Sequence, residues 1–167
     1  VAVGDICNTT DTLVQKRKHK ILYRNFVEVF GFLPQIAQSR FDESRHNVYN
    51  PLAAEMPATS IVPHAPYSVS NELFGLIDQH SEGKIISIHN QETKEENEFF
   101  KTGTGRFVEF YKLLGSNIDF FQPSGKSSLQ TYLPKLNLPG KILLVHNTQT
   151  SEEDILFTHN TAKENHQ

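Results

Sequence analysis

Short apolar segments alternate with helical stretches along the whole chain, and this alternation restricts the fold more than any other feature. Helical spacing appears between the apolar segments, for example in Leu73, Phe74 and Ile77 on one helix face. Strands that alternate with helices form βαβ units, whose strands pair in parallel. We expect five such strands, at residues 1–6, 21–32, 59–63, 84–89 and 141–145.

The segments between the expected strands predict helices and one long, extended connection. Segments 85–88 and 142–145 are almost continuously apolar, which is typical of strands covered on both faces. Capping-box spacings that begin at Thr93 and Thr150 predict two helix starts. Further helices are expected at 11–19, 35–43 and 71–80, irregular structure at 45–57, and an extended excursion with a short helix at 116–140.

Composition excludes several classes of protein. The 167 residues are 37% hydrophobic and carry a formal net charge of -3, which allows one sizeable core and argues against nucleic acid. The basic run at 16–20 is typical of a solvated helix end. No apolar run approaches the roughly 20 residues that cross a bilayer, so no membrane partner is expected. The single cysteine, Cys7, fits packing in a strand and a cytoplasmic location.

Three of the expected strands run directly into a histidine, namely His64, His89 and His146. In parallel α/β folds the loops after the carboxyl ends of the strands converge on one face. One strand-end histidine alone is more often structural. Three at equivalent positions on successive strands favour a shared site, and we expect their rings to face one mouth.

Glu92 follows His89 by three residues and would lie at the rim of that mouth. A neutral imidazole suits zinc or iron, and a nearby carboxylate that binds no metal can carry protons between water and substrate. The alternative is a charge that stabilises a helix N-terminus, which is the better interpretation of Glu92 taken alone.

Four segments together resemble the amidohydrolase superfamily, in the branch of metal-dependent deaminases and chlorohydrolases. Residues 60–70, with the sequence SIVPHAPYSVS, are similar to the strand-four signature of that group. Residues 86–92 are similar to its strand-five H-x-x-E motif, 143–147 to its strand-six histidine segment and 1–5 to its second strand. The resemblance implies an α/β fold of parallel βαβ units, an incomplete TIM (β/α)8 barrel that covers roughly strands two to six in one domain, 1–167.

The resemblance also implies a role for each residue. His89 would be the metal ligand, Glu92 the proton shuttle and His146 the group that orients the attacking water. His64 would face the substrate. At Gln149 the adenosine-analogue branch often carries a substrate-contacting histidine, so the glutamine departs from that pattern at a substrate-binding position. The implied reaction is hydrolysis of a C–N bond in a nucleobase-like or related small molecule, with one divalent metal, zinc or iron.

The metal site that the resemblance implies is incomplete. The family also uses an H-x-H pair on strand one and an aspartate on strand eight, and no two of the eight histidines here are two residues apart. A complete barrel takes roughly 250 residues. We therefore expect a fragment of an enzyme, inactive alone, that binds metal weakly or not at all. The histidines are at positions 19, 46, 64, 80, 89, 146, 159 and 166.

Two other hypotheses stay open, a non-enzymatic α/β binding or interaction module that retains barrel motifs, and a doubly wound domain of flavodoxin type. Against the latter, segment 4–8 after the first strand contains only one glycine, whereas a phosphate loop is glycine-rich. Five strands of an eight-stranded barrel would leave two unpaired edges and exposed apolar surface. We therefore expect a homodimer through these edges, or marginal stability.

Overall fold

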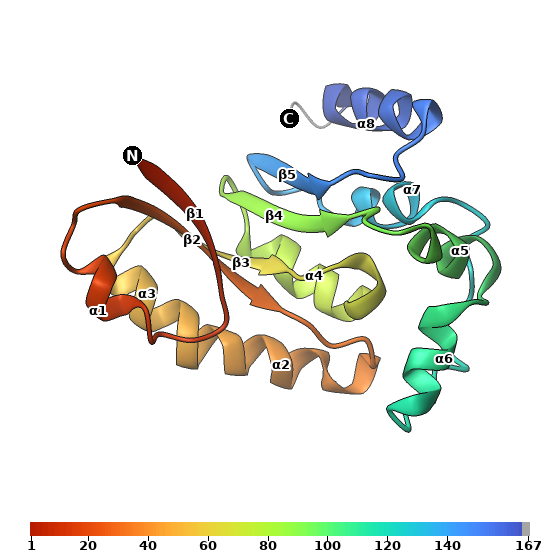
Figure 1. Cartoon of the computed structure of the whole chain (residues 1–167), viewed down its shortest axis with the longest axis horizontal. Coiled ribbons are helices and arrows are strands. Elements are labelled where there is room, and N and C mark those ends of the chain that lie inside the picture. The colour runs from red at the N-terminus through yellow and green to blue at the C-terminus, as the bar shows by residue number, and fades with distance from the viewer. Residues whose placement is uncertain (165–167) are drawn as a thin grey trace.

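The computed structural model describes residues 1–164, and its five strands pair only in parallel (Figure 1). Two sheets have the orders β1-β2-β3 and β4-β5. The backbone N–H of His89 donates to the carbonyl of His64 at 3.0 Å, which joins β4 to the end of β3. The strands are β1 (Ala2–Cys7), β2 (Leu22–Val29), β3 (Thr59–Pro63), β4 (Ile85–Asn90) and β5 (Lys141–His146).

Helices connect the strands in the order expected for βαβ units. In Figure 1 the arrowheads of β3, β4 and β5 point to the side where α5 lies, while α8 lies beside β5. No helix among residues 1–164 has both the length and the apolar character to cross a membrane. The helices are α1 (Leu13–Lys16), α2 (Ala37–Ser44), α3 (Asn50–Glu55), α4 (Asn71–His80), α5 (Lys94–Thr102), α6 (Arg106–Leu113), α7 (Ser128–Tyr132) and α8 (Glu152–Glu164).

The segment predicted to be irregular at 45–57 is largely helical, so that prediction is wrong. A π-helical turn at Arg45–Tyr49 joins α2 to α3. Pro51 lies in the first turn of α3, where its missing N–H is tolerated. The buried side chains of Val48 and Leu52 pack this continuous helical segment against the sheet. Tertiary packing therefore outweighs the local sequence preference for irregular structure.

The basic run at 16–20 is exposed at four of its five residues, as expected for a solvated helix end, and only Lys16 departs from the prediction. Lys16 is buried and forms an ion pair with Asp5, with 2.5 Å between Nζ and Oδ2. Arg17 pairs with Glu55 at 2.6 Å on the surface. Both cations attach α1 to neighbouring elements, and α1 itself covers only four residues.

Both predicted capping boxes form differently. Thr93 is the N-cap of α5, but its side chain makes no capping bond. The Glu96 carboxylate turns inward and accepts from Gln91 N–H at 3.0 Å. At α8 the box lies one residue later than expected. Ser151 Oγ accepts from Asp154 N–H at 3.2 Å, and Asp154 accepts from Ser151 N–H at 3.1 Å.

The main core lies between the strands and the helices that cover them. Ile61 of β3, Ile86 and Ile88 of β4, and Leu73 and Ile77 of α4 are essentially inaccessible to solvent. β4 is therefore buried, as its apolar sequence predicted. The burial of these chains supplies most of the driving force that sets β3 and β4 beside one another.

β5 departs from the prediction that it would be covered on both faces. Leu143 is 46% exposed, and the residues of the strand are either partly buried or exposed. β1 is also mostly exposed, including Val3. Within the described chain each of these strands has one strand partner, so both are edges.

Cys7 has the packing role that was expected. It is buried with Leu13 and Val27 in a second cluster. Burial raises the pKa of the Cys7 thiol to about 11, so the thiol stays protonated at neutral pH.

Candidate active site at the carboxyl ends of the strands

Three histidine rings meet where β3, β4 and β5 end. His64 follows β3 directly, His89 is next to the last residue of β4, and His146 is the last residue of β5. The ring centroids of His64 and His89 are 5.3 Å apart, and those of His89 and His146 are 5.2 Å apart. The structure thus brings the three rings to one mouth, with His89 in the middle.

Glu28 belongs to this cluster, although it is not among the site residues predicted from the sequence. Its Oε1 lies 3.1 Å from Nε2 of His89, and its side chain is only 9% exposed. Glutamate is rarely buried unless it is paired. A signal was present in the sequence, because Glu28 is the one charged residue within the apolar run 26–30.

His89 has a polar partner at each ring nitrogen. Nε2 faces Glu28, and Nδ1 lies 3.2 Å from Nε2 of His146. A carboxylate only accepts, so in the neutral tautomer Nε2 of His89 donates to Glu28 and Nδ1 accepts from His146.

His64 is held as a neutral imidazole. Its Nδ1 lies 2.8 Å from Ser68 Oγ, and the Ser68 hydroxyl donates to the Ala65 carbonyl at 3.0 Å. Ser68 therefore accepts from Nδ1–H, which leaves the lone pair of His64 on Nε2. Burial lowers the pKa of His64, and this outweighs the opposing effect of the Glu28 carboxylate.

Glu92 and Gln149 occupy the rim. Oε2 of Glu92 lies 3.6 Å from Nε2 of His146, and its side chain is about half exposed. Gln149 is exposed, and the hydrogen bonds found for it within the described chain are made by its backbone, with Gln91 and Asn97. The structure therefore places Glu92 beside the histidines but does not bring the Gln149 side chain to them.

The loops that carry the site have unusual backbone conformations. Gln91, His146 and Asn147 have φ angles of 46°, 77° and 59°, in the left-handed region. Such a conformation costs a non-glycine residue on the order of 1 kcal/mol or more. Asn147 N–H donates to the Asn90 carbonyl at 3.0 Å, and Asn90 Nδ2 donates to Asn147 Oδ1 at 2.8 Å. These bonds tie the end of β5 to that of β4 and set the direction of His146.

A buried polar network supports the same loop from behind. Gln91 donates from Nε2 to Asp154 at 2.9 Å and from its backbone to Glu96. Ser127 donates to Asp154 and Ser128 donates to Glu96, each at 2.5 Å. Burial raises the pKa of Glu96. Burial acts in the same direction on Asp154, but its hydrogen bonds with Ser127 and Gln91 outweigh it and lower the Asp154 pKa.

The donor set fits a zinc or iron ion. Ligand atoms of Glu28, His64 and His89 all lie within 4.8 Å of one another. Two ligand atoms about 2.1 Å from one tetrahedral ion are roughly 3.4 Å apart. This is close to the 3.1 Å between Oε1 of Glu28 and Nε2 of His89, so an ion bound there would replace the hydrogen bond between these two atoms. Two nitrogens and one carboxylate oxygen are also the ligand types that these metals accept.

Comparisons with known proteins bear on the fold. No family model matches the chain, and no curated protein matches it. The crystal structure of Helicobacter pylori aminofutalosine deaminase is similar, with a TM-score of 0.80 and 20% identity, over 97% of this chain and 40% of that one. A structure of the same enzyme in complex with methylthio-coformycin has a TM-score of 0.72 and 21% identity, with the same coverage. The chain thus spans 40% of the length of the deaminase, and the predicted fold class is confirmed: an α/β chain of parallel βαβ units that forms an incomplete barrel.

Proposed function

We propose that this chain is the central part of the barrel of a metal-dependent amidohydrolase, and that the parent enzyme is a deaminase. The observation that carries the proposal is the meeting of His64, His89 and His146 with Glu28 and Glu92 where the strands end. The similarity of the fold to that of a deaminase supports it. The substrate class that we assign is a nucleobase-like or related small molecule with a C–N bond to be hydrolysed.

One divalent metal ion, zinc or iron, is assigned to the cluster with His89 as its ligand. Glu28 and His64 supply the other donor atoms that this chain offers. In the parent enzyme, where further ligands join His89, the lone pair of His64 faces the substrate instead. The ion would supply Lewis-acid chemistry and lower the pKa of water at the site.

Glu92 is assigned the proton transfer. Its carboxylate is close enough to His146 to share a water with it, and exposed enough to reach a substrate. Glu92 takes a proton from the attacking water and gives it to the leaving nitrogen. A C–O bond forms, the C–N bond breaks and ammonia leaves. His146 orients the water, and Gln149 contacts the substrate from the rim.

The chain by itself is proposed to be inactive and to hold its metal weakly. The enzymes that it resembles add an H-x-H pair and an aspartate to the strand-five histidine, and this sequence contains no H-x-H pair. Glu28 and His64 replace such ligands only in part, because Glu28 also interacts with His89 directly.

Binding of methylthio-coformycin tests the proposed function, since a similar deaminase fold is known in complex with this compound. Calorimetry should show that the zinc-loaded chain binds the compound. Removal of zinc and the substitution Glu92→Gln should each weaken this binding about tenfold, which is a loss of about 1.4 kcal/mol of binding free energy. Glu153→Gln on α8 is the control, because Glu153 is exposed and lies outside the cluster. Binding that depends neither on zinc nor on Glu92 would contradict the enzyme and favour the non-enzymatic binding module.

A further inference from the structure

An apolar cavity of about 450 Å³ adjoins the histidine cluster, beyond the ends of β2 and β3. Small-molecule sites commonly have volumes of about 300–1,000 Å³. Its inner end is formed by Glu28 and His64, and its outer walls include Phe30, Tyr67, Phe110 and Leu114. The cavity is therefore of a size to hold part of a small organic molecule.

The cavity and the cluster are continuous. Glu28 lines the cavity and also lies 3.1 Å from His89. His64 lines it as well, with its ring centroid 5.3 Å from that of His89. A molecule whose reacting group lies beside His89 therefore has the cavity directly next to it.

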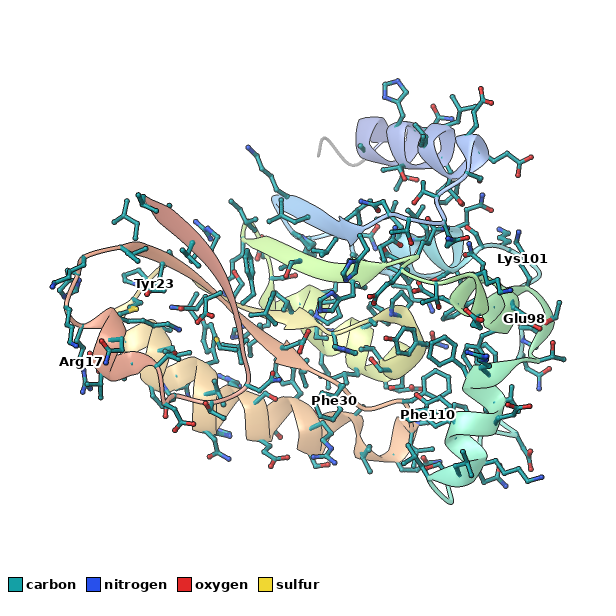
Figure 2. All side chains as sticks on the ribbon, viewed as in Figure 1. Arg17, Tyr23, Phe30, Glu98, Lys101 and Phe110 are labelled. Carbon is teal, nitrogen blue, oxygen red and sulfur yellow. The ribbon has the colours of Figure 1, made fainter. Side chains whose placement is uncertain are left out.

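The outer wall exposes more apolar surface than the fold requires. Phe30 is 50% exposed, Phe110 is 48% exposed and Leu114 is 60% exposed. Figure 2 shows Phe30 just past β2 and Phe110 on α6, and both line the same cavity. Exposed apolar side chains that lie next to one another around a cavity are typical of a ligand-binding site.

The wall formed by α6 is preformed. Tyr111 O–H donates to the Tyr67 carbonyl at 2.6 Å, and the Tyr111 ring stacks on Phe32 with 4.8 Å between centroids. Gly105 begins α6 with a φ of 90°, and a Cβ there would meet the Glu98 carboxylate at 2.6 Å. The glycine thus permits the tight turn from α5 that brings α6 over the cavity.

We propose that this cavity is a specificity site that takes an apolar arm, aryl or branched alkyl, attached to the group whose C–N bond is hydrolysed. The identity of the reacting group rests on the proposed function. The preference for the arm rests on the lining of the cavity alone. The two can therefore be tested separately, because binding of an arm needs no metal.

Two amidines serve as matched probes for the metal-free chain. Benzamidine carries a phenyl arm on a planar cationic amidine that can pair with Glu28, whereas acetamidine has the same amidine with a methyl group. In an NMR titration benzamidine should bind at least about tenfold more tightly, because its ring buries more apolar area than the methyl group of acetamidine. Phe110→Ser should weaken benzamidine binding about fivefold and leave acetamidine binding unchanged. Leu113→Ser is the control, since Leu113 lies on α6, is 87% exposed and does not line the cavity.

Leu114→Ser should repeat the effect of Phe110→Ser, and amide spectra of all three variants check that the fold is kept. Equal affinities for the two amidines, unchanged benzamidine binding in the Phe110 and Leu114 variants, or shifts confined to residues elsewhere would overturn the proposed specificity site. If the arm is recognised while methylthio-coformycin binding is independent of zinc, the cavity stands and the hydrolase proposal falls. The reverse pattern leaves the hydrolase and removes the cavity.

Discussion

Nδ1 of His89 lies 3.2 Å from Nε2 of His146, although 57 positions separate the two residues in the sequence. Glu28 holds the other nitrogen of His89, and Glu92 lies beside His146. Side chains from β2, β4, β5 and the loop after β4 therefore form one line across the mouth. Any metal bound through His89 is sensitive to each of them.

Glu28→Gln is expected to lower the zinc affinity of the chain about 10- to 100-fold, the usual effect of removing a carboxylate that binds or orients at a metal site. Competition with a fluorescent chelator measures this affinity. Glu43→Gln is the matched control, because Glu43 pairs with Arg40 on the surface. An unchanged zinc affinity in Glu28→Gln would show that Glu28 has no part in the site.

Asp154→Ala should lower the free energy of unfolding by about 2–3 kcal/mol, because it leaves buried donors without an acceptor. The donors are Ser127, Gln91, Gln130 and Ser151. Glu153→Ala, one residue away and exposed, should change it by no more than about 0.5 kcal/mol. Urea unfolding followed by circular dichroism measures both, and equal effects of the two substitutions would contradict the role of the network.

Glu96 should give the stability a pH dependence of defined sign. Burial raises its folded pKa, so the stability that it contributes is full below the unfolded pKa of about 4.3 and is lost as the pH rises through the folded value. Glu96→Gln removes this loss. Relative to the native chain, the variant should therefore gain unfolding free energy as the pH rises from about 4 to 7. A difference that stays constant over this range would contradict the raised pKa.

Self-association is expected through the two edge strands. Val3 on β1 is 38% exposed and Leu143 on β5 is 46% exposed. Light scattering after size exclusion should show a dimer, and Leu143→Lys should weaken it at least about tenfold, because a charge at an edge opposes strand pairing. Leu156→Lys on α8 is the control, at 56% exposure. A stable monomer of the native chain would refute this expectation.

Much of the fold was predictable because its signals are local. The bounds of β3 and α4 agree with the predicted residues, since the apolar segment and the helical spacing there coincide with burial. The predicted break at 45–57 failed because packing of Val48 and Leu52 outweighs the local effect of Pro51. The capping box expected to begin at Thr150 begins one residue later, at Ser151. Several acidic residues follow one another there, and the sequence alone does not show which of them caps the helix.

The candidate site was predictable only in part, for a related reason. The end of a parallel strand fixes where a residue lies, so His64, His89 and His146 could be placed together without a structure. The pairing of Glu28 with His89 joins residues 61 positions apart, and no local pattern reports it. The support of Gln91 by Asp154 depends on the way that α8 packs, which local sequence does not encode. The predicted domain extended to residue 167, and its last three residues lie outside the described chain.

Calorimetric titration of the metal-free chain with zinc tests the central claim most directly. The account predicts one weakly bound equivalent per chain, lost in His89→Ala and kept in His159→Ala, whose histidine lies exposed on α8. Failure of the native chain to bind zinc, or an undiminished equivalent in His89→Ala, would contradict the assignment of a metal to the cluster of Glu28, His64 and His89.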